Sequence, residues 1–127
     1  MTRDEIMNME AGRKLDALAA ERVMEWTWVD GRGTAGPSYW EGASGEFMVD
    51  FQPSTDIAAA WQVLEKIHSW VGTDKDDLKG KNWVNAFHYE LLRLEWYMAI
   101  TKTAEAAAAI ICRAALLAVT DTGEDDD

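Results

Sequence analysis

The sequence predicts a single domain of the α+β class, in which an antiparallel β-sheet is layered between helices as an α/β/α sandwich. Helical and strand-like segments follow in the order helix, strand, strand, helix, strand, strand, helix, which fits such a sheet. The chain has 127 residues, of which 48% are hydrophobic, and this suffices for one buried core. We expect the domain to cover residues 1–120, followed by an acidic, disordered tail over residues 121–127.

The first elements expected are a helix over about residues 12–24 and a short strand over residues 26–29. Apolar residues such as Leu15 and Ala19 recur at helical spacing, and charged residues occupy the other faces. The strand consists of β-forming residues and ends at an Asp-Gly turn. Residues 31–45 contain five glycines and a proline, so they are expected to form a loop.

A second strand and a second helix are expected around Pro53. Aromatic and aliphatic residues alternate with other residues over 47–51, which indicates a strand that stops before the proline. Thr55 and Asp56 then provide side-chain oxygens that can accept from free backbone amides. A helix over about 56–70 is therefore predicted, with an apolar face made by Ile57, Trp61, Leu64, Ile67 and Val71.

The last third of the chain is expected to hold a β-hairpin and a buried helix. After a polar connection over 72–81, residues 83–92 and 94–101 are rich in β-formers, and the second stretch alternates apolar residues on one face. They predict an antiparallel hairpin with its turn near 91–94. Residues 103–119, capped by Thr103, are apolar around most of the helix and predict an element covered on most sides.

Charge and composition exclude several classes of function. The formal net charge is -11, from 23 acidic and 12 basic residues, which argues against direct binding to DNA or RNA. The N-terminal residues lack the unbroken apolar stretch of a secretory signal, and the most apolar window is too short for a membrane span. A single cysteine cannot form an internal disulfide, so we expect a cytoplasmic protein.

No pattern in the sequence indicates an enzyme, a metal site or a cofactor. Cys112 has apolar neighbours, in which a thiol is inert. His68 and His88 lie on different predicted elements, without a Cys, Asp or Glu at zinc-ligand spacing. The G-x-G-x-x-G match at residues 31–36 is followed by Pro37 instead of a helix, so a surface loop is expected there.

Arg113 and the tryptophans are the candidates for ligand binding. Arg113 is the sole cation within 104–119, so it should form a structural ion pair, for example with Glu65 or Asp56, or clamp a phosphate or carboxylate of a ligand. The seven tryptophans exceed what a core of this size uses. Trp40 and Trp83 in particular are candidates for stacking a base or anchoring a protein interface.

Three segments together resemble the phage ABA sandwich domain family, and more distantly the NinX-like phage proteins. They are residues 1–16, Pro53-Ser54-Thr55-Asp56-Ile57-Ala58-Ala59-Ala60-Trp61, and Ala109-Ile110-Ile111-Cys112-Arg113-Ala114-Ala115-Leu116-Leu117-Ala118. The resemblance implies a layered helix-sheet-helix fold, an origin in tailed phages or prophages, and no established enzymatic activity. The glycine loop before Tyr39 and the acidic tail depart from the family pattern.

Two functions remain open from the sequence. The first is a non-enzymatic phage accessory protein that counters host defence by sequestering a small nucleotide signal, with its ligand site between subunits of a homo-oligomer in the infected bacterial cytoplasm. The alternative is an acidic protein-binding module that imitates nucleic acid and inhibits a host or phage enzyme. For the first, the candidate ligand-binding residues are Arg113, Trp61, Trp83, Trp40, Thr55 and Asp56.

Overall fold

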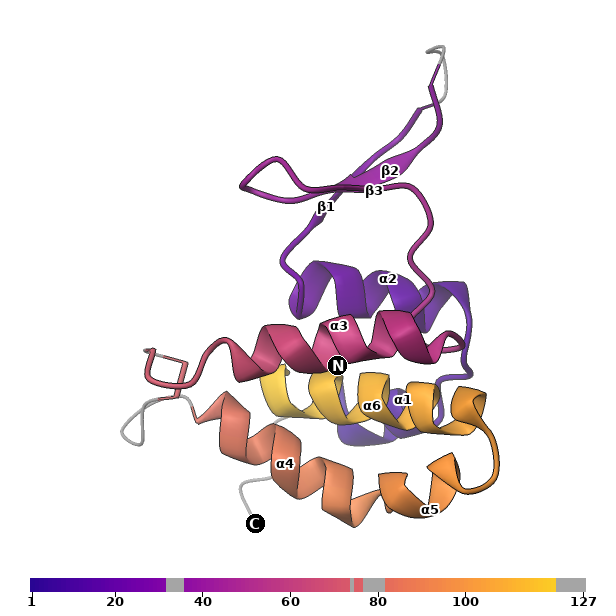
Figure 1. The fold of residues 1–127 in the computed structure, drawn as a ribbon, viewed down its shortest axis with the longest axis vertical. Helices are drawn as coiled ribbons and strands as arrows, with labels where there is room; N and C mark the ends of the chain where they lie inside the picture. The colour runs from indigo at the N-terminus through magenta and orange to yellow at the C-terminus, as the bar shows by residue number, and fades with distance from the viewer. Residues whose placement is uncertain (32–35, 74, 77–81, 121–127) are drawn as a thin grey trace.

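The computed structural model describes residues 1–31, 36–73, 75–76 and 82–120, and in this part of the chain it shows six helices and a three-stranded antiparallel sheet (Figure 1). The predicted α+β class is confirmed. The elements, in order, are α1 Arg3–Met7, α2 Arg13–Arg22, β1 Thr27–Val29, β2 Tyr39–Glu41, β3 Phe47–Met48, α3 Ile57–His68, α4 Trp83–Arg93, α5 Trp96–Ile100 and α6 Ala104–Val119.

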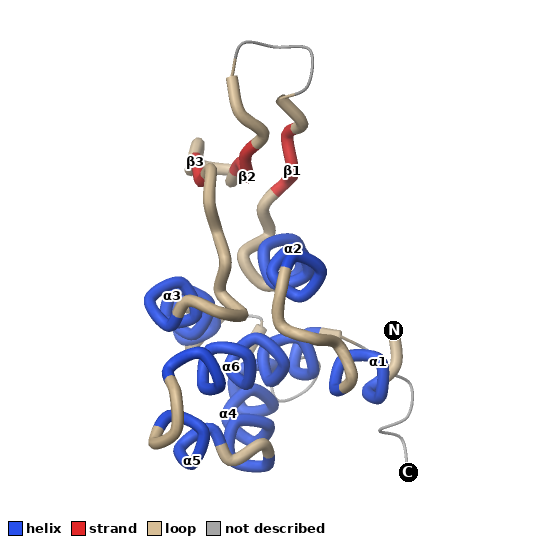
Figure 2. The backbone as a smooth tube through the Cα atoms, turned by 90° about the vertical axis from the view of Figure 1, so that its right-hand side faces the viewer, coloured by secondary structure: helices blue, strands red, loops and turns tan. Residues whose placement is uncertain are grey.

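The helices pack on one another around α6, and the sheet stands beyond α2 at one end of this helical body (Figures 1 and 2). Helix α6 contacts each of the other five helices. Ten of its 16 residues are buried, which confirms the prediction of a covered helix. The side chain of Thr103 accepts from the Ala106 amide at 3.0 Å and begins the helix as expected. No described helix combines the length and the apolar character that crossing a bilayer requires.

Helices α2 and α3 confirm two further predictions. In α2, the buried face includes Leu15 and Ala19. In α3, Asp56 is the N-cap, and its carboxylate accepts from the Ala58 amide at 3.1 Å. The predicted apolar face of α3 is wrong in most positions, because the buried residues are Ala59, Ala60, Val63 and Ile67. Of the predicted residues only Ile67 is fully buried, Ile57 and Leu64 are partly buried, and Trp61 and Val71 are 41% and 62% exposed.

The predicted hairpin over 83–101 is wrong, because its first half is helix α4. Asn82 caps this helix and accepts from the Asn85 amide at 3.2 Å. Helix α4 buries Val84, Phe87 and Leu91, which are three and four residues apart and so share one helical face. The many β-forming residues led to the prediction of a strand, although the apolar spacing is helical. Burial of this face against α6 favours the helix in the structure.

The second half of the predicted hairpin is the short helix α5. The residue before it, Glu95, has a positive φ of 55° and separates α5 from α4 near the predicted turn. The alternating apolar residues do not form a buried strand face, since Met98 and Ile100 are exposed and Ala99 is the buried residue of α5. Packing on α6 selects the helix.

The sheet has the order β1-β2-β3, and its three strands are short. The prediction of a strand near 26–29 is confirmed by β1, but β2 falls within the predicted loop over 31–45, and β3 ends before the predicted limit at residue 51. Helix α1, which carries a capping box formed by Thr2 and Glu5, was not predicted. Residues 32–35 of the glycine motif and the predicted tail over 121–127 lie outside the described residues.

Candidate functional site

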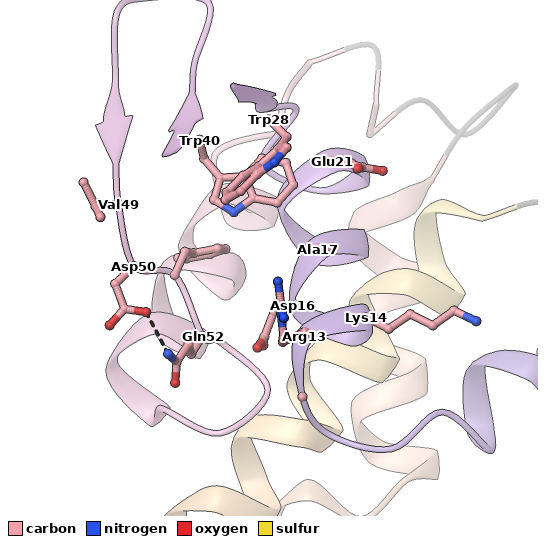
Figure 3. A pocket seen from close by; sticks show the side chains of 12 residues that line it. Arg13, Lys14, Asp16, Ala17, Glu21, Trp28, Trp40, Val49, Asp50 and Gln52 are labelled. Carbon is pink, nitrogen blue, oxygen red and sulfur yellow. Dashed lines mark hydrogen bonds between the residues drawn. The ribbon is translucent and has the colours of Figure 1, made fainter. Parts of the chain in front are cut away.

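A cleft of about 810 Å³ lies between α2 and the sheet, together with the segment that follows β3 (Figure 3). Its walls combine aromatic side chains from the sheet side with charged side chains from α2. The lining residues are Gly12, Arg13, Lys14, Asp16, Ala17, Glu21, Trp28, Trp40, Val49, Asp50, Phe51 and Gln52.

Two tryptophans form the aromatic wall. Trp28 of β1 and Trp40 of β2 are directly paired in the antiparallel ladder, so their side chains project from the same face of the sheet. The ring centroids are 4.9 Å apart, with the planes tilted by 60°. Trp40 is buried, whereas Trp28 is 46% exposed. The wall therefore has an anchored ring and an accessible ring.

A second aromatic pair contributes to the same side of the cleft. Phe51, which lines the cleft, packs edge-on against Trp26 with centroids 4.8 Å apart. Both Phe51 and Trp40 belong to the buried core cluster. The aromatic side of the cleft is thus continuous with the core and is held in place by it.

A buried polar contact fixes the floor of the cleft. The Ser54 amide donates to Asp16 Oδ1 at 2.7 Å, and the Gly12 amide donates to Ser54 Oγ at 2.8 Å. These bonds join the first turn of α2 to the turn before α3. Burial raises the pKa of Asp16, and the hydrogen bonds from Ser54 partly offset this effect.

The first turn of α2 brings positive charge to the cleft. Arg13 and Lys14 are both exposed lining residues, and Lys14 points away from the two tryptophans (Figure 3). The N-cap residue Gly12 makes no side-chain capping bond. On the other side, Gln52 donates to Asp50 Oδ1 at 2.7 Å. The cleft therefore offers a cationic helix start and carboxylates around an aromatic wall.

Of the six predicted binding residues, all of which the structure describes, Trp40 alone lines the cleft. Trp61 of α3 packs edge-on against Trp96 of α5 at 6.4 Å between centroids. Trp83 pairs with Trp70 at 5.5 Å. Together with the two pairs at the cleft, these pairs include all seven tryptophans, which are therefore distributed over four separate aromatic pairs.

The remaining predicted residues have local structural partners. Asp56 caps α3, and the Thr55 hydroxyl donates to the Gln52 carbonyl at 3.5 Å. Arg113 is half-buried and donates through Nη2 to the Met9 carbonyl at 2.9 Å and through Nε at 3.3 Å. The guanidinium therefore bonds to a backbone carbonyl between α1 and α2 in place of the expected ion pair. This contact connects that segment to α6.

The predicted burial of Cys112 is confirmed. It is a free cysteine with no exposed surface, and this burial, with a smaller contribution from the charge of Asp16, raises the pKa of its thiol far above the usual range. Within the described residues, no group of three or more His, Cys, Asp or Glu side chains is arranged to hold a metal ion.

Sequence reasoning missed most of the cleft residues, notably Trp28, Phe51 and Asp16. Trp26, just before β1, and Trp28 within it are two residues apart, so strand alternation alone would place both rings on the same face. The spacing therefore gave no signal that the Trp28 ring is accessible while the Trp26 ring packs against Phe51. The pairing of Trp28 with Trp40 depends on β2, whose segment was expected to be loop.

The cleft lies largely within a segment that matches a known family. Residues 17–116 match the family model of the phage ABA sandwich domain, from the middle of α2 to near the end of α6. No curated protein and no solved structure matches the chain. The matched segment covers well over half of the sequence, and the chain therefore belongs to the phage ABA sandwich domain family.

Proposed function

We propose that this protein is a non-enzymatic phage accessory protein that binds and sequesters a small nucleotide-like molecule in the cleft between α2 and the sheet. The observation that carries the proposal is the Trp28–Trp40 pair, which forms the wall of a cleft of about 810 Å³. This volume is in the range of small-molecule sites, which are roughly 300–1,000 Å³.

The accessible ring of Trp28 supplies the binding energy for a planar base. Its 46% exposure leaves surface for a ligand to cover, while Trp40 beneath it is already buried and rigid. Stacking of a base on an aromatic side chain contributes about 1–3 kcal/mol. Because every base has a π-face, this contact favours nucleotides as a class, and the polar groups around it provide selectivity.

The start of α2 supplies the contact for an anionic group. Arg13 offers a planar guanidinium that fits a phosphate with two hydrogen bonds. Gly12 leaves the first amides of a ten-residue helix without a side-chain cap, and such amides favour an anion. In this proposal Arg13 takes the phosphate-binding role that the sequence suggested for Arg113, because Arg113 is engaged with Met9.

The carboxylates of the cleft are better suited to accept hydrogen bonds from sugar hydroxyls than to transfer protons. Asp16 already accepts from the Ser54 amide, and Asp50 from Gln52. Each holds a position in the fold and has lone pairs left to accept from a hydroxyl. Retention of the ligand without turnover is the function we propose, in the cytoplasm of an infected bacterium.

Calorimetric titration of the purified chain with cyclic nucleotides and cyclic ADP-ribose isomers tests the proposal. We expect saturable heat with one class of ligand, and an affinity roughly 5- to 150-fold weaker for Trp28→Ala, since a stacked base contributes about 1–3 kcal/mol. Trp61→Ala is the matched control, because its ring is similarly exposed but packs against Trp96 away from the cleft lining. Arg13→Ala should weaken binding more than Lys14→Ala.

The second measurement is mass spectrometry of the small molecules that heating releases from the protein. For this measurement the protein is purified from cells with active defence signalling. Absence of heat across the panel together with absence of a retained molecule would refute sequestration. Equal losses in Trp28→Ala and Trp61→Ala would instead show that the effect is not specific to the cleft. The mass of the complex in solution, measured by light scattering, tests the proposed homo-oligomer.

The net charge of -11 favours a second candidate, an acidic module that binds a basic protein surface. Electrostatic association of this kind weakens steeply with salt, whereas stacking in the cleft does not. A basic partner that remains bound at physiological salt and is released at high salt, with no effect of Trp28→Ala, would favour this candidate over sequestration.

A further inference from the structure

The two histidines of the chain meet on the surface, although they come from different helices. His68 is the last residue of α3, and His88 lies within α4, which packs beside α3. Their Nε2 atoms are 3.1 Å apart and both side chains are exposed. Neither residue lines the cleft between α2 and the sheet.

The geometry of the pair differs from that of a straight hydrogen bond. If one ring donated to the other in line, the ring centroids would lie about 5.4 Å apart. The observed centroid separation is 4.9 Å, with an interplanar angle of 31°. The centroid separation is shorter than an in-line arrangement gives, so at least one ring is inclined to the line that joins the two Nε2 atoms.

A transition-metal ion that bridges the two Nε2 atoms fits these separations. A metal placed at the usual metal–imidazole distance of about 2.05 Å from each Nε2 would subtend an N–metal–N angle of about 98°. This value lies between the octahedral and tetrahedral angles of about 90° and 109°. The same placement puts the ring centroids about 4.8 Å apart, close to the observed separation.

The chemistry of imidazole suits both rings to act as ligands. Neutral imidazole is the form that binds a metal, so binding releases any proton that a ring nitrogen carries. The two rings repel each other when both are charged and are joined when both bind one cation.

We infer that His68 and His88 form a two-histidine site for a divalent transition-metal ion such as Zn²⁺, Ni²⁺ or Cu²⁺, which bridges α3 and α4. Imidazole nitrogen selects these ions over Mg²⁺ and Ca²⁺, which prefer oxygen. Within the described residues no third His, Cys, Asp or Glu completes a cluster, so water fills the remaining coordination positions. The ion links the end of α3 to α4. The site is independent of the proposed nucleotide cleft.

Calorimetric titration with ZnCl₂ tests this inference on the full chain, produced without a polyhistidine tag and treated with EDTA. We expect one equivalent of Zn²⁺ to bind, and the midpoint of thermal unfolding to rise by several degrees because the ion binds the folded state. Affinity should fall at least tenfold in His68→Gln and in His88→Gln. MgCl₂ at the same concentration should cause no histidine-dependent shift.

Electron paramagnetic resonance spectra of the copper-loaded protein identify the ligands directly. With one equivalent of Cu²⁺, nitrogen hyperfine splitting should indicate two imidazole ligands in the wild type and one in either single variant. Circular dichroism of the metal-free variants should show wild-type helix content, since both side chains are exposed. Unchanged Zn²⁺ affinity in the double variant would overturn the inference and assign binding to acidic residues. Absence of binding at millimolar Zn²⁺ would overturn it equally, leaving only a hydrogen-bonded pair.

Discussion

The helical body around α6 and the small sheet differ in how they use their side chains. Helix α6 is 16 residues long and buries ten of them against the other five helices. The strands are two or three residues long, and they leave Trp28 and Phe47 largely exposed. The body therefore supplies most of the apolar burial, while the sheet presents aromatic surface to the cleft and to solvent.

The sheet is held in place by a few side chains that reach the body. A three-stranded sheet this short is marginal by itself. Trp40 and Phe51 are buried in the core cluster and connect the sheet to the helices. The accessible ring of Trp28 thus rests on a rigid support, and its substitution should affect binding much more than folding.

The largest effect expected on stability is in the body. Phe87 in α4 is fully buried. We predict that Phe87→Ala lowers the free energy of unfolding by about 3–5 kcal/mol, because it removes an aromatic ring from a close-packed core and leaves a cavity. Urea unfolding followed by circular dichroism measures this change.

Ligand binding provides the contrast for the same variant. At temperatures where Phe87→Ala remains folded, its affinity for a ligand in the cleft should equal that of the wild type, because Phe87 does not line the cleft. A loss of affinity in the folded variant would show that body and sheet are coupled, which would break the division between them.

A medium effect is expected at the junction of the two regions, where Asp16 accepts from the buried Ser54 amide. We predict that Asp16→Ala lowers the free energy of unfolding by about 1–3 kcal/mol, since it leaves that amide without its acceptor. Asp16→Asn keeps an oxygen acceptor at the same position and should cost less at neutral pH. Thermal or urea unfolding of both variants makes the comparison.

The pH dependence of these variants follows from the raised pKa of Asp16 in the folded state. A carboxyl with a raised folded-state pKa contributes stability that is fully present below its unfolded pKa, near the ordinary 3.8, and is lost as pH rises through the folded value. Asp16→Asn cannot ionise. Its stability relative to the wild type should therefore improve as pH rises from about 3.8 through that value, and a flat difference would contradict the assignment.

Much of the helical body was predictable because capping residues and spacing agree there. Asp56 and Thr103 begin α3 and α6 as expected, and the apolar character of α6 correctly predicts its burial. In α4 the two signals conflict, since aromatic and branched residues favour a strand but Val84, Phe87 and Leu91 have helical spacing. Tertiary packing on α6 resolves the conflict in favour of the helix.

The cleft was less predictable because it is built from long-range pairings. Trp28 and Trp40 are brought together by strand pairing across a glycine-rich segment, and the Asp30-Gly31 turn at its start did not show where the partner strand lies. Asp16 and Ser54 are 38 residues apart, and their contact exists only once α2 lies against the turn before α3. Arg113 has a hydrogen-bond partner, as expected for a guanidinium in an apolar helix. The spacing of residues around Arg113 does not predict that this partner is the Met9 carbonyl, which is 104 residues away in the sequence.

The smallest effect is expected at the outer edge of the sheet. Phe47 in β3 is 59% exposed and packs against Tyr39 with ring centroids 4.4 Å apart. We predict that Phe47→Ala changes the free energy of unfolding by only about 0.5 kcal/mol, because an exposed ring gains little from burial and its loss creates no cavity. Urea unfolding beside Phe87→Ala measures the ratio of the two effects. A cost approaching that of Phe87→Ala would mean that the sheet belongs to the same cooperative core as α6. Ligand affinity at Trp28 would then depend on the stability of the whole fold and not on the cleft alone.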